Sequence, residues 1–354
     1  MKLTFLVPGA LNQLTGGYVF DRKVVECLRA LGRGVDVIEL SGRYPAADNL
    51  ACTAAQNALA SLPSGSPVVI DGLALPAFDA CLDIESKRLN IIGFIHHPLF
   101  LETGLSAADA SSYAELEARL WRLLRGIICP SAHTSKAVIA AGVSSVRVAI
   151  SPPGTGKVVR ASERRSSTQL QLLAVGTVTQ RKGHLLLIEA LAGLRDELEN
   201  IDWKLTCIGS VERDPVAANA AREAIAANQL EDRVLLAGEQ PQEFLTNTYE
   251  RADIFVLPSY HEGYGMVFTE AMAHGLPIIS TTAGAIPDTV PAAAALLVEP
   301  GDAGALRDAL RSVMIDGELR ARLAAGARQA AAELPDWDAA VLNWSHALDR
   351  LLAA

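Results

Sequence analysis

Short apolar runs recur along the chain, and most are followed by a longer segment in which apolar residues recur every three or four positions. Such runs occupy residues 2–8, 35–40, 66–72, 90–97, 126–131 and 146–151 in the first half, and residues 170–176, 203–209, 233–238, 253–259, 276–281 and 294–299 in the second. Most of these runs are uniformly apolar rather than alternating, as expected for parallel strands that are covered on both faces. Repeated alternation of strands and helices predicts doubly wound α/β sheets.

A segment without apolar periodicity separates the two series of strands. It is rich in Pro, Gly, Ser and Arg, which favours an interdomain linker, placed at residues 156–168. The pattern therefore predicts two Rossmann-like domains, residues 1–155 and 169–334, that face each other across a cleft. Residues 335–354 are predicted to form a C-terminal helix, capped by Asp336, that can cross back to the first domain.

Composition narrows the class of protein. The 354 residues suit two domains, and a formal net charge of −9 argues against binding to nucleic acid through phosphate contacts. The five cysteines are scattered without metal-ligand spacing, as expected for buried apolar residues in a reducing compartment. The start of the chain reaches Pro8-Gly9 too soon for a signal peptide, and no run approaches the roughly 20 apolar residues that span a bilayer. We expect a soluble, cytoplasmic protein.

The stretch YHEGYGMVFTEAMAHGLPIIS, residues 260–280, carries two glutamates in different settings. Glu262 lies on a glycine-rich loop after an apolar strand, and Glu270 lies in the second turn of the following helix. Gly263 and Gly265 allow backbone N–H groups to approach a ligand, and a helix N-terminus favours an anion such as a diphosphate. The carboxylate of Glu270 can accept two hydrogen bonds from a ribose diol, and that of Glu262 can accept them from sugar hydroxyls. The alternative is that both are solvated charges.

A basic turn follows the first strand of the second series. In VGTVTQRKG, residues 175–183, the strand ends at Gly176, and Arg181-Lys182 leads into a helix. Two cations at the carboxyl end of a strand can neutralise a diphosphate leaving group as its charge develops. A solvated basic turn is the alternative, but both clusters are expected at the same edge of one sheet.

Together the Glu262–Glu270 pair, the Arg-Lys-Gly turn and AHGLPIISTTAGAIPD, residues 273–288, resemble the retaining nucleotide-sugar glycosyltransferases of family GT4, which have the GT-B fold. The resemblance implies that Lys182, assisted by Arg181, contacts the donor diphosphate, and that Glu270 binds the ribose. It assigns the donor sugar and phosphates to Glu262 and to the backbone of Gly263, Tyr264, Gly265, Met266 and Val267. Thr177 departs from the family, where an arginine is common at this position. Arg181 and Lys182 are therefore left to neutralise the charge of the phosphates.

The first domain lacks a GxGxxG motif, so no dinucleotide cofactor is expected. The resemblance implies that Gly16 and Gly17 let the first helix approach the transferred sugar or its phosphates, the alternative being a plain loop. The family places one histidine after the strand NIIGFIHH, and the alignment favours His96, with His97 as the second choice. We predict no metal site at His96, His97 and His133, because adjacent side chains on an extended chain point apart.

The resemblance predicts transfer of a sugar to an acceptor hydroxyl with retention at the anomeric carbon, without metal or cofactor. No nucleophile pair of the glycosidase kind is evident, and the family implies a front-face reaction. Two alternatives are a 2-epimerase-like isomerase of nucleotide sugars and a non-catalytic nucleotide-sugar binder. The acceptor is left open among a small molecule, a glycan and a lipid. The amphipathic helix near residues 109–126 is interpreted as core packing, with peripheral membrane contact as the weaker alternative.

Overall fold

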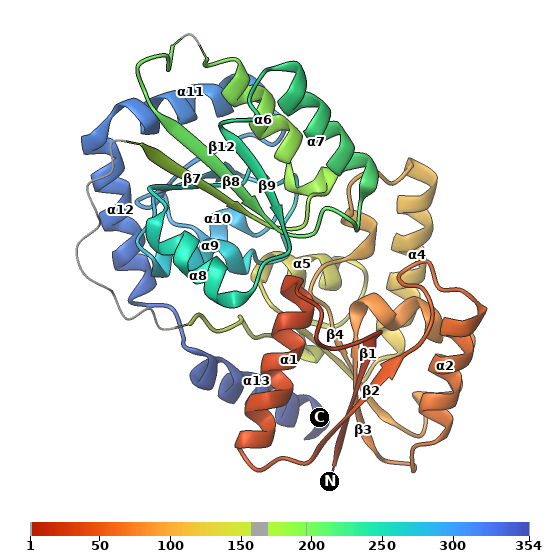
Figure 1. Cartoon of the computed structure of the whole chain (residues 1–354). Helices are drawn as coiled ribbons and strands as arrows, with labels where there is room; N and C mark the ends of the chain where they lie inside the picture. Colours follow the sequence, from red (N-terminus) through yellow and green to blue (C-terminus); the bar gives the residue numbers. More distant parts are fainter. Residues whose placement is uncertain (1, 157–168, 196, 354) are drawn as a thin grey trace. The chain divides into compact units, whose positions relative to one another are not determined.

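The computed structural model describes residues 2–156, 169–195 and 197–353 of the chain (Figure 1). Its contacts divide the chain into two compact units, which are Met1–Gly154 with Pro335–Ala354, and Thr155–Leu334. We call them the first and the second unit. Most of the linker predicted at residues 156–168 lies outside the described residues.

The first unit is built on a six-stranded parallel sheet. Its strands are β1 (Leu3–Pro8), β2 (Val35–Leu40), β3 (Pro67–Asp71), β4 (Asn90–Phe94), β5 (Gly126–Cys129) and β6 (Val148–Ile150). Its helices are α1 (Gly16–Ala30), α2 (Asn49–Ala60), α3 (Leu82–Glu85), α4 (Ala107–Leu123), α5 (Ala132–Ala140) and α13 (Trp337–Ala353), with 3₁₀ turns η1 (Gly72–Phe78), η2 (Leu99–Leu101) and η3 (Ser145–Arg147). The strand order is β2-β1-β3-β4-β5-β6.

The second unit repeats the plan with another six-stranded parallel sheet. Its strands are β7 (Leu170–Val175), β8 (Trp203–Ile208), β9 (Val234–Gly238), β10 (Ile254–Val256), β11 (Ile278–Thr281) and β12 (Ala295–Val298). Its helices are α6 (His184–Ala192), α7 (Pro215–Ala227), α8 (Gln242–Arg251), α9 (Met266–Ala273), α10 (Ile286–Thr289), α11 (Ala303–Ile315) and α12 (Gly317–Ala331), with the 3₁₀ turn η4 (Gln180–Lys182). Each of the twelve predicted runs contains one strand, so the predicted fold class is confirmed.

The order of the strands indicates where each sheet can bind a ligand. The second sheet has the order β12-β11-β10-β7-β8-β9, so the direction of winding reverses between β7 and β10. The first sheet reverses between β1 and β3. In open parallel sheets ligands bind at the carboxyl ends of the strands beside such a reversal. The segments that follow β7, β10, β1 and β3 are therefore the first places to look for a site.

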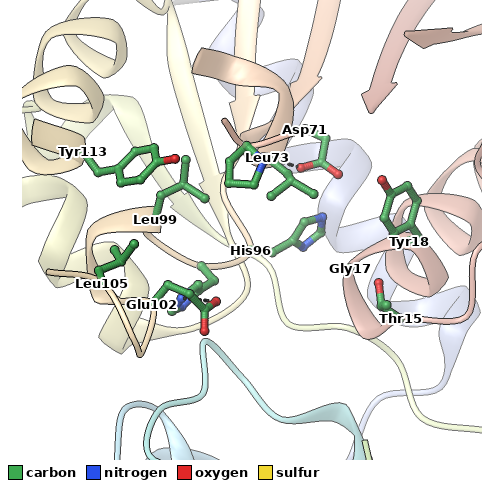
Figure 2. A pocket seen from close by; sticks show the side chains of 12 residues that line it. Thr15, Gly17, Tyr18, Asp71, Leu73, His96, Leu99, Glu102, Leu105 and Tyr113 are labelled. Carbon is green, nitrogen blue, oxygen red and sulfur yellow. Dashed lines mark hydrogen bonds and ion pairs between the residues drawn. The ribbon is translucent and has the colours of Figure 1, made fainter. Parts of the chain in front are cut away.

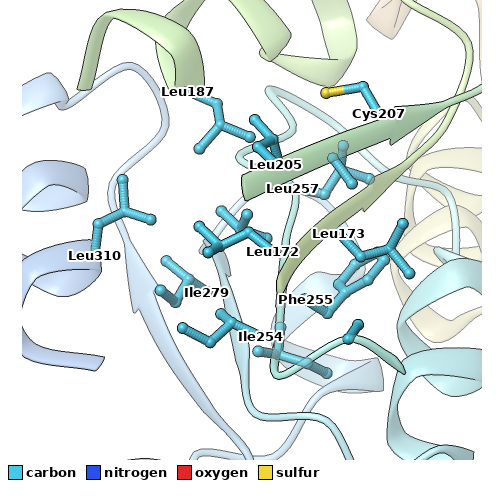
Figure 3. Packing of buried hydrophobic residues seen from close by; sticks show 14 of the residues in the cluster. Leu172, Leu173, Leu187, Leu205, Cys207, Ile254, Phe255, Leu257, Ile279 and Leu310 are labelled. Atoms are coloured by element: carbon cyan, nitrogen blue, oxygen red, sulfur yellow. The ribbon is translucent and has the colours of Figure 1, made fainter. Parts of the chain in front are cut away.

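Apolar side chains from both faces of each sheet form a core. In the second unit Leu172, Phe255 and Ile279 of the sheet meet Leu187 and Leu310 of the helices (Figure 3). Because these strands are covered on both faces, they read as continuous apolar runs in the sequence. In the part of the chain that the structure describes, no helix combines the length and the apolar content that crossing a bilayer requires.

The C-terminal helix α13 packs in the first unit. The ring of Trp344 stacks on Phe5 at 6.3 Å between centroids and meets the edge of Phe94 at 5.5 Å. The backbone N–H of Ala339 donates to Asp336 Oδ1 at 2.9 Å, so Asp336 caps the helix as predicted. Residues after the second sheet thus complete the core of the first unit.

The amphipathic helix α4 buries its apolar side. Leu120 and Leu124 are fully buried, while Leu116 and Leu123 pack against the same core cluster. The core-packing interpretation of this helix is therefore confirmed.

Candidate functional site

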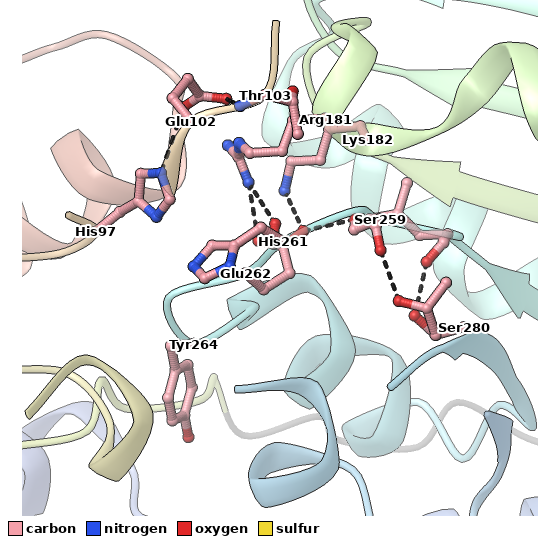
Figure 4. A network of polar contacts seen from close by, with 12 residues as sticks. His97, Glu102, Thr103, Arg181, Lys182, Ser259, His261, Glu262, Tyr264 and Ser280 are labelled. Atoms are coloured by element: carbon pink, nitrogen blue, oxygen red, sulfur yellow. Dashed lines mark hydrogen bonds and ion pairs between the residues drawn. The ribbon is translucent and has the colours of Figure 1, made fainter. Parts of the chain in front are cut away.

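Arg181, Lys182 and Glu262 meet at the reversal point of the second sheet. The two cations lie on η4, directly after β7, and Glu262 lies on the loop after β10 (Figure 4). Gly183 follows them with φ +70°, and a Cβ there would lie 2.2 Å from the carbonyl oxygen of Pro258. Only glycine therefore allows the basic turn to pack this closely against the β10 loop.

The carboxylate of Glu262 is the centre of a buried ion cluster. Lys182 Nζ donates to Glu262 Oε1 at 2.7 Å, and Ser259 Oγ donates to the same oxygen at 2.7 Å. Arg181 Nη1 lies 3.4 Å from Glu262 Oε2. Burial raises the pKa of Glu262, but the charges of Lys182 and Arg181 outweigh it and lower the pKa to about 2. The carboxylate is ionised, and the three residues together carry one net positive charge.

This cluster changes the interpretation of Glu262. Its side chain is only 5% exposed, so the solvated-charge alternative is wrong. Both oxygens have donors inside the protein, and a sugar hydroxyl would have to replace one of them or join it. The geometry makes Glu262 a counter-ion that fixes the positions of Arg181 and Lys182, a role that the sequence motif did not indicate.

The glycine segment after Glu262 leads into α9. Gly265, the N-cap residue, has φ +87° and offers no capping side chain to the first N–H groups of this helix. Thr289 Oγ1 donates to the carbonyl oxygen of Tyr264 at 2.8 Å, and Ala285 N–H donates to that of Glu262 at 2.9 Å. The segment is therefore held from the α10 side, while the helix N-terminus keeps a partial positive charge that suits an anion.

Glu270 lies on α9 and is oriented by a tyrosine. Tyr249 Oη, on α8, donates to Glu270 Oε2 at 2.9 Å, and the Tyr249 ring stacks on His274 at 5.0 Å between centroids. Burial raises the pKa of Glu270 to about 7, although the hydrogen bond from Tyr249 acts in the opposite direction. Tyr249 was not predicted as a site residue. It lies on the buried side of the helix before β10, where a buried hydroxyl needs a polar partner.

A second polar cluster lies at the reversal point of the first sheet, after β1, β3 and β4. His96 Nε2 lies 2.8 Å from Asp21 Oδ1. Leu73 N–H donates to Asp71 Oδ1 at 2.7 Å, and Asp71 and His96 lie on the same side of a pocket (Figure 2). A Cβ on Gly17 would lie 3.4 Å from His96 Cδ2, so the glycine lets α1 begin beside the imidazole ring. A Cβ on Gly16 would meet no atom within 4 Å.

The charges of this cluster are set by burial. Asp21 is 0% exposed and Asp71 is 3% exposed. Burial raises the pKa of Asp21 to about 7, against the effect of its hydrogen bond with Asp71, and burial and the charge of Asp21 raise the pKa of Asp71 well above its usual range. Burial lowers the pKa of His96. Burial therefore favours the protonated form of both carboxyl groups and the neutral form of the imidazole beside them.

The same three residues are the group that can offer ligands to a metal ion. Their nearest oxygen and nitrogen atoms lie within 4.8 Å of one another, and within the described residues neither His97 nor His133 joins such a group. Asp71 could have been found from the sequence, because it ends a strand beside the one that leads to His96. Asp21 could not, since it lies on the buried side of α1 among apolar residues.

A pocket of about 250 Å³ opens beside this cluster in the first unit (Figure 2). Its lining residues are Thr15, Gly17, Tyr18, Pro45, Asp71, Leu73, His96, His97, Leu99, Glu102, Leu105 and Tyr113. His96 and His97 both lie on it, and His97 Nε2 is 3.5 Å from Glu102 Oε2. The strand end therefore presents both histidines to one pocket, but only His96 reaches the carboxyl pair.

One wall of the pocket is held by a buried carboxylate. Glu117, on α4, is 3% exposed and accepts hydrogen bonds from Leu99 N–H at 2.9 Å and Phe100 N–H at 3.1 Å, one on each oxygen. These bonds fix η2, which carries Leu99 into the pocket. Burial raises the pKa of Glu117 to about 7, with the two backbone bonds acting in the opposite direction.

We expect Glu117→Gln to lower the free energy of unfolding, because an amide offers one acceptor oxygen to two N–H donors; one lost buried bond costs about 1–3 kcal/mol. A carboxyl whose pKa is raised on folding stabilises most below its unfolded pKa of 4.5, and this contribution is lost as the pH rises through about 7. The Gln variant does not titrate at this position. The difference in free energy of unfolding between it and the unaltered protein should therefore shrink between about pH 5 and about pH 8. Thermal unfolding at both pH values tests this, with Glu115→Gln on the exposed side of α4 as control. A deficit independent of pH would contradict it.

Sequence comparison finds a family match in the second unit and several curated relatives of the chain. The family Glycosyl transferases group 1 matches residues 157–330. The D-inositol 3-phosphate glycosyltransferase of Xylanimonas cellulosilytica is 32% identical over 170 residues, which is 48% of this chain and 39% of that protein. This chain spans less than half the length of such curated relatives in these matches.

Comparison of structures covers both units. The sucrose-phosphate synthase of Thermosynechococcus elongatus matches 100% of this chain and 99% of its own with a TM-score of 0.80 and 21% identity. Anabaena Alr3699/HepE, solved in complex with UDP-glucose, matches 100% of both chains with a TM-score of 0.73 and 17% identity. At such identities the likeness establishes the fold, which is that of the GT-B glycosyltransferases.

Proposed function

Because residues 157–330 match the family Glycosyl transferases group 1, we propose that this protein transfers a sugar from a nucleoside-diphosphate sugar to an acceptor hydroxyl. The observation that carries the proposal is the buried cluster of Arg181, Lys182 and Glu262 at the β7/β10 reversal. It holds one net positive charge at the place where a parallel sheet binds its ligand.

In the proposed reaction the donor diphosphate lies against Lys182, Arg181 and the N-terminus of α9. The bond between the anomeric carbon and the diphosphate oxygen breaks, and the fixed cations stabilise the charge that develops on the leaving phosphate. We propose that the acceptor hydroxyl attacks from the same face, so that the configuration is retained, and that the leaving phosphate takes its proton. Positioning and positive charge are then what the protein supplies, without a metal.

We propose that Glu270 binds the ribose, with Tyr249 orienting its carboxylate. In the first unit we propose that the imidazole of His96 and the N-terminus of α1 at Gly16 and Gly17 contact the transferred sugar. The acceptor is a small molecule, a glycan or a lipid, and the name of the Xylanimonas relative adds a phosphorylated cyclitol to that range.

Two other functions would use the same donor site. A 2-epimerase-like isomerase converts a nucleotide sugar in the absence of any acceptor, which product analysis on the donor alone reveals. A non-catalytic binder holds the nucleotide sugar without hydrolysis or transfer. The fixed cations beside the helix N-terminus favour the transferase over the binder. Cations aimed at the leaving phosphate stabilise the charge that forms when the bond breaks, and a protein that only binds the donor does not need this stabilisation.

We expect one of UDP, GDP and ADP to raise the midpoint of thermal unfolding in the presence of EDTA. At a hundred times the dissociation constant a ligand adds about 2.7 kcal/mol, which corresponds to a rise of several degrees. The nucleotide that produces the rise identifies the donor base. Lack of a rise with all three in folded protein would contradict the proposal, and a rise that EDTA abolishes would show that a metal is required.

A further inference from the structure

The charged side chains that line the pocket of the first unit are mainly acidic. Its twelve lining residues include the carboxyl groups of Asp71 and Glu102 but neither lysine nor arginine. Behind Asp71 lies the fully buried Asp21, and burial raises the pKa of both carboxyl groups. The side chain of Glu102 is 41% exposed and adds a second carboxylate at the rim.

The pocket has a polar end and an apolar wall. Asp71 and His96 form the polar end, with Leu73 beside Asp71, whereas Leu99, Leu105 and Tyr113 lie on the opposite side (Figure 2). The apolar wall is rigid where Glu117 holds η2 in place. A ligand that fills this space can bury one apolar face while it hydrogen-bonds a hydroxyl at the other end.

We propose that this pocket binds the acceptor, and that the acceptor is an uncharged molecule with an apolar face, placed with its hydroxyl toward Asp71 and His96. This inference rests on the proposed transferase function. The hydroxyl can donate to the Asp71 carboxyl, and the ring or chain beyond it packs on Leu73, Leu99, Leu105 and Tyr113. A phosphorylated acceptor would put a second negative charge near Glu102 and beside the buried Asp71, with neither lysine nor arginine among the lining residues, which is unfavourable.

The test uses two acceptor analogues that differ in one substituent, 4-nitrophenyl α-D-glucopyranoside and α-D-glucose 1-phosphate, with the corresponding manno- and galacto- pairs. Binding is measured by ligand-observed NMR, and transfer is measured with the donor base found by thermal unfolding. We expect the aryl glycosides to bind and react better by roughly tenfold or more, as a repulsion of about 1.4 kcal/mol gives. Equal or better binding of the phosphates, or binding of neither class, overturns the proposal.

A charge reversal locates the effect. In Glu102→Lys the preference for the aryl glycoside over the phosphate should fall by about tenfold, because a cation replaces a carboxylate at the rim. Glu115→Lys is the matched control, since Glu115 is exposed on α4 and does not line the pocket. The same fall in both variants overturns the proposal.

Nucleotide binding is followed in each variant. It is assigned to the second unit, so its persistence while the acceptor preference fails separates an error in this inference from an error in the proposed function.

Discussion

Lys182→Ala should lower kcat/KM for sugar transfer by tens to hundreds of fold and should also destabilise the second unit. The loss of activity follows from one charge-assisted hydrogen bond to the leaving phosphate, which contributes roughly 1.5–3 kcal/mol. The loss of stability follows from Glu262, whose buried carboxylate would keep Ser259 and the more distant Arg181 as partners but lose its closest cation. Breaking a buried ion pair on one side costs roughly 3–5 kcal/mol.

The double variant Lys182→Ala/Glu262→Gln separates the two effects. A neutral amide at position 262 needs no counter-ion, so denaturant unfolding should show most of the stability restored, while steady-state kinetics should show the activity still low. Lys204→Ala, an exposed lysine on β8, is the control and should change neither. Activity of Lys182→Ala within about twofold of the unaltered protein would refute the phosphate role. An equally unstable double variant would refute the counter-ion role of Glu262.

Glu270→Gln should weaken nucleotide binding by about tenfold or more and remove part of its pH dependence. An ionised carboxylate accepts hydrogen bonds from both hydroxyls of a ribose, whereas a protonated carboxyl group offers fewer acceptor sites. With the pKa of Glu270 at about 7, the affinity of the unaltered protein should rise as the pH rises through that value. Isothermal titration calorimetry at about pH 6 and about pH 8 measures this rise in both proteins.

The comparison with Glu270→Gln is needed because the nucleotide's own phosphate ionises in the same range. That contribution is common to both proteins, so the difference between their pH profiles belongs to Glu270. Glu250→Gln, on the exposed side of α8, should behave as the unaltered protein. Identical pH profiles for the unaltered protein and Glu270→Gln would exclude Glu270 as the ribose ligand. Tyr249→Phe should shift the profile to higher pH, because the hydrogen bond from Tyr249 lowers the pKa of Glu270.

The sequence by itself determined the fold class and the position of the donor-side motifs. Continuous apolar runs separated by helical patterns specify covered parallel strands, because burial on both faces leaves no polar positions in a strand. Arg181, Lys182 and Glu262 could be selected because they lie on segments that follow strands, where ligands bind, and Glu270 because it lies on the helix after such a segment. These signals are local, because each can be recognised within one strand–loop–helix segment.

Only the tertiary structure decided what these residues contact. Lys182 and Glu262 meet because β7 pairs with β10, although two strands separate them in the sequence. This order is set by the packing of whole strands. Asp21 meets His96 across 75 positions, on a helix side that looks like any other buried side in the sequence. Tyr249 and Glu117 also lie on buried sides of helices and meet partners that are distant in the sequence. A charge or hydroxyl in a buried pattern requires a partner, but the physical chemistry of a single segment does not specify which distant residue will be that partner.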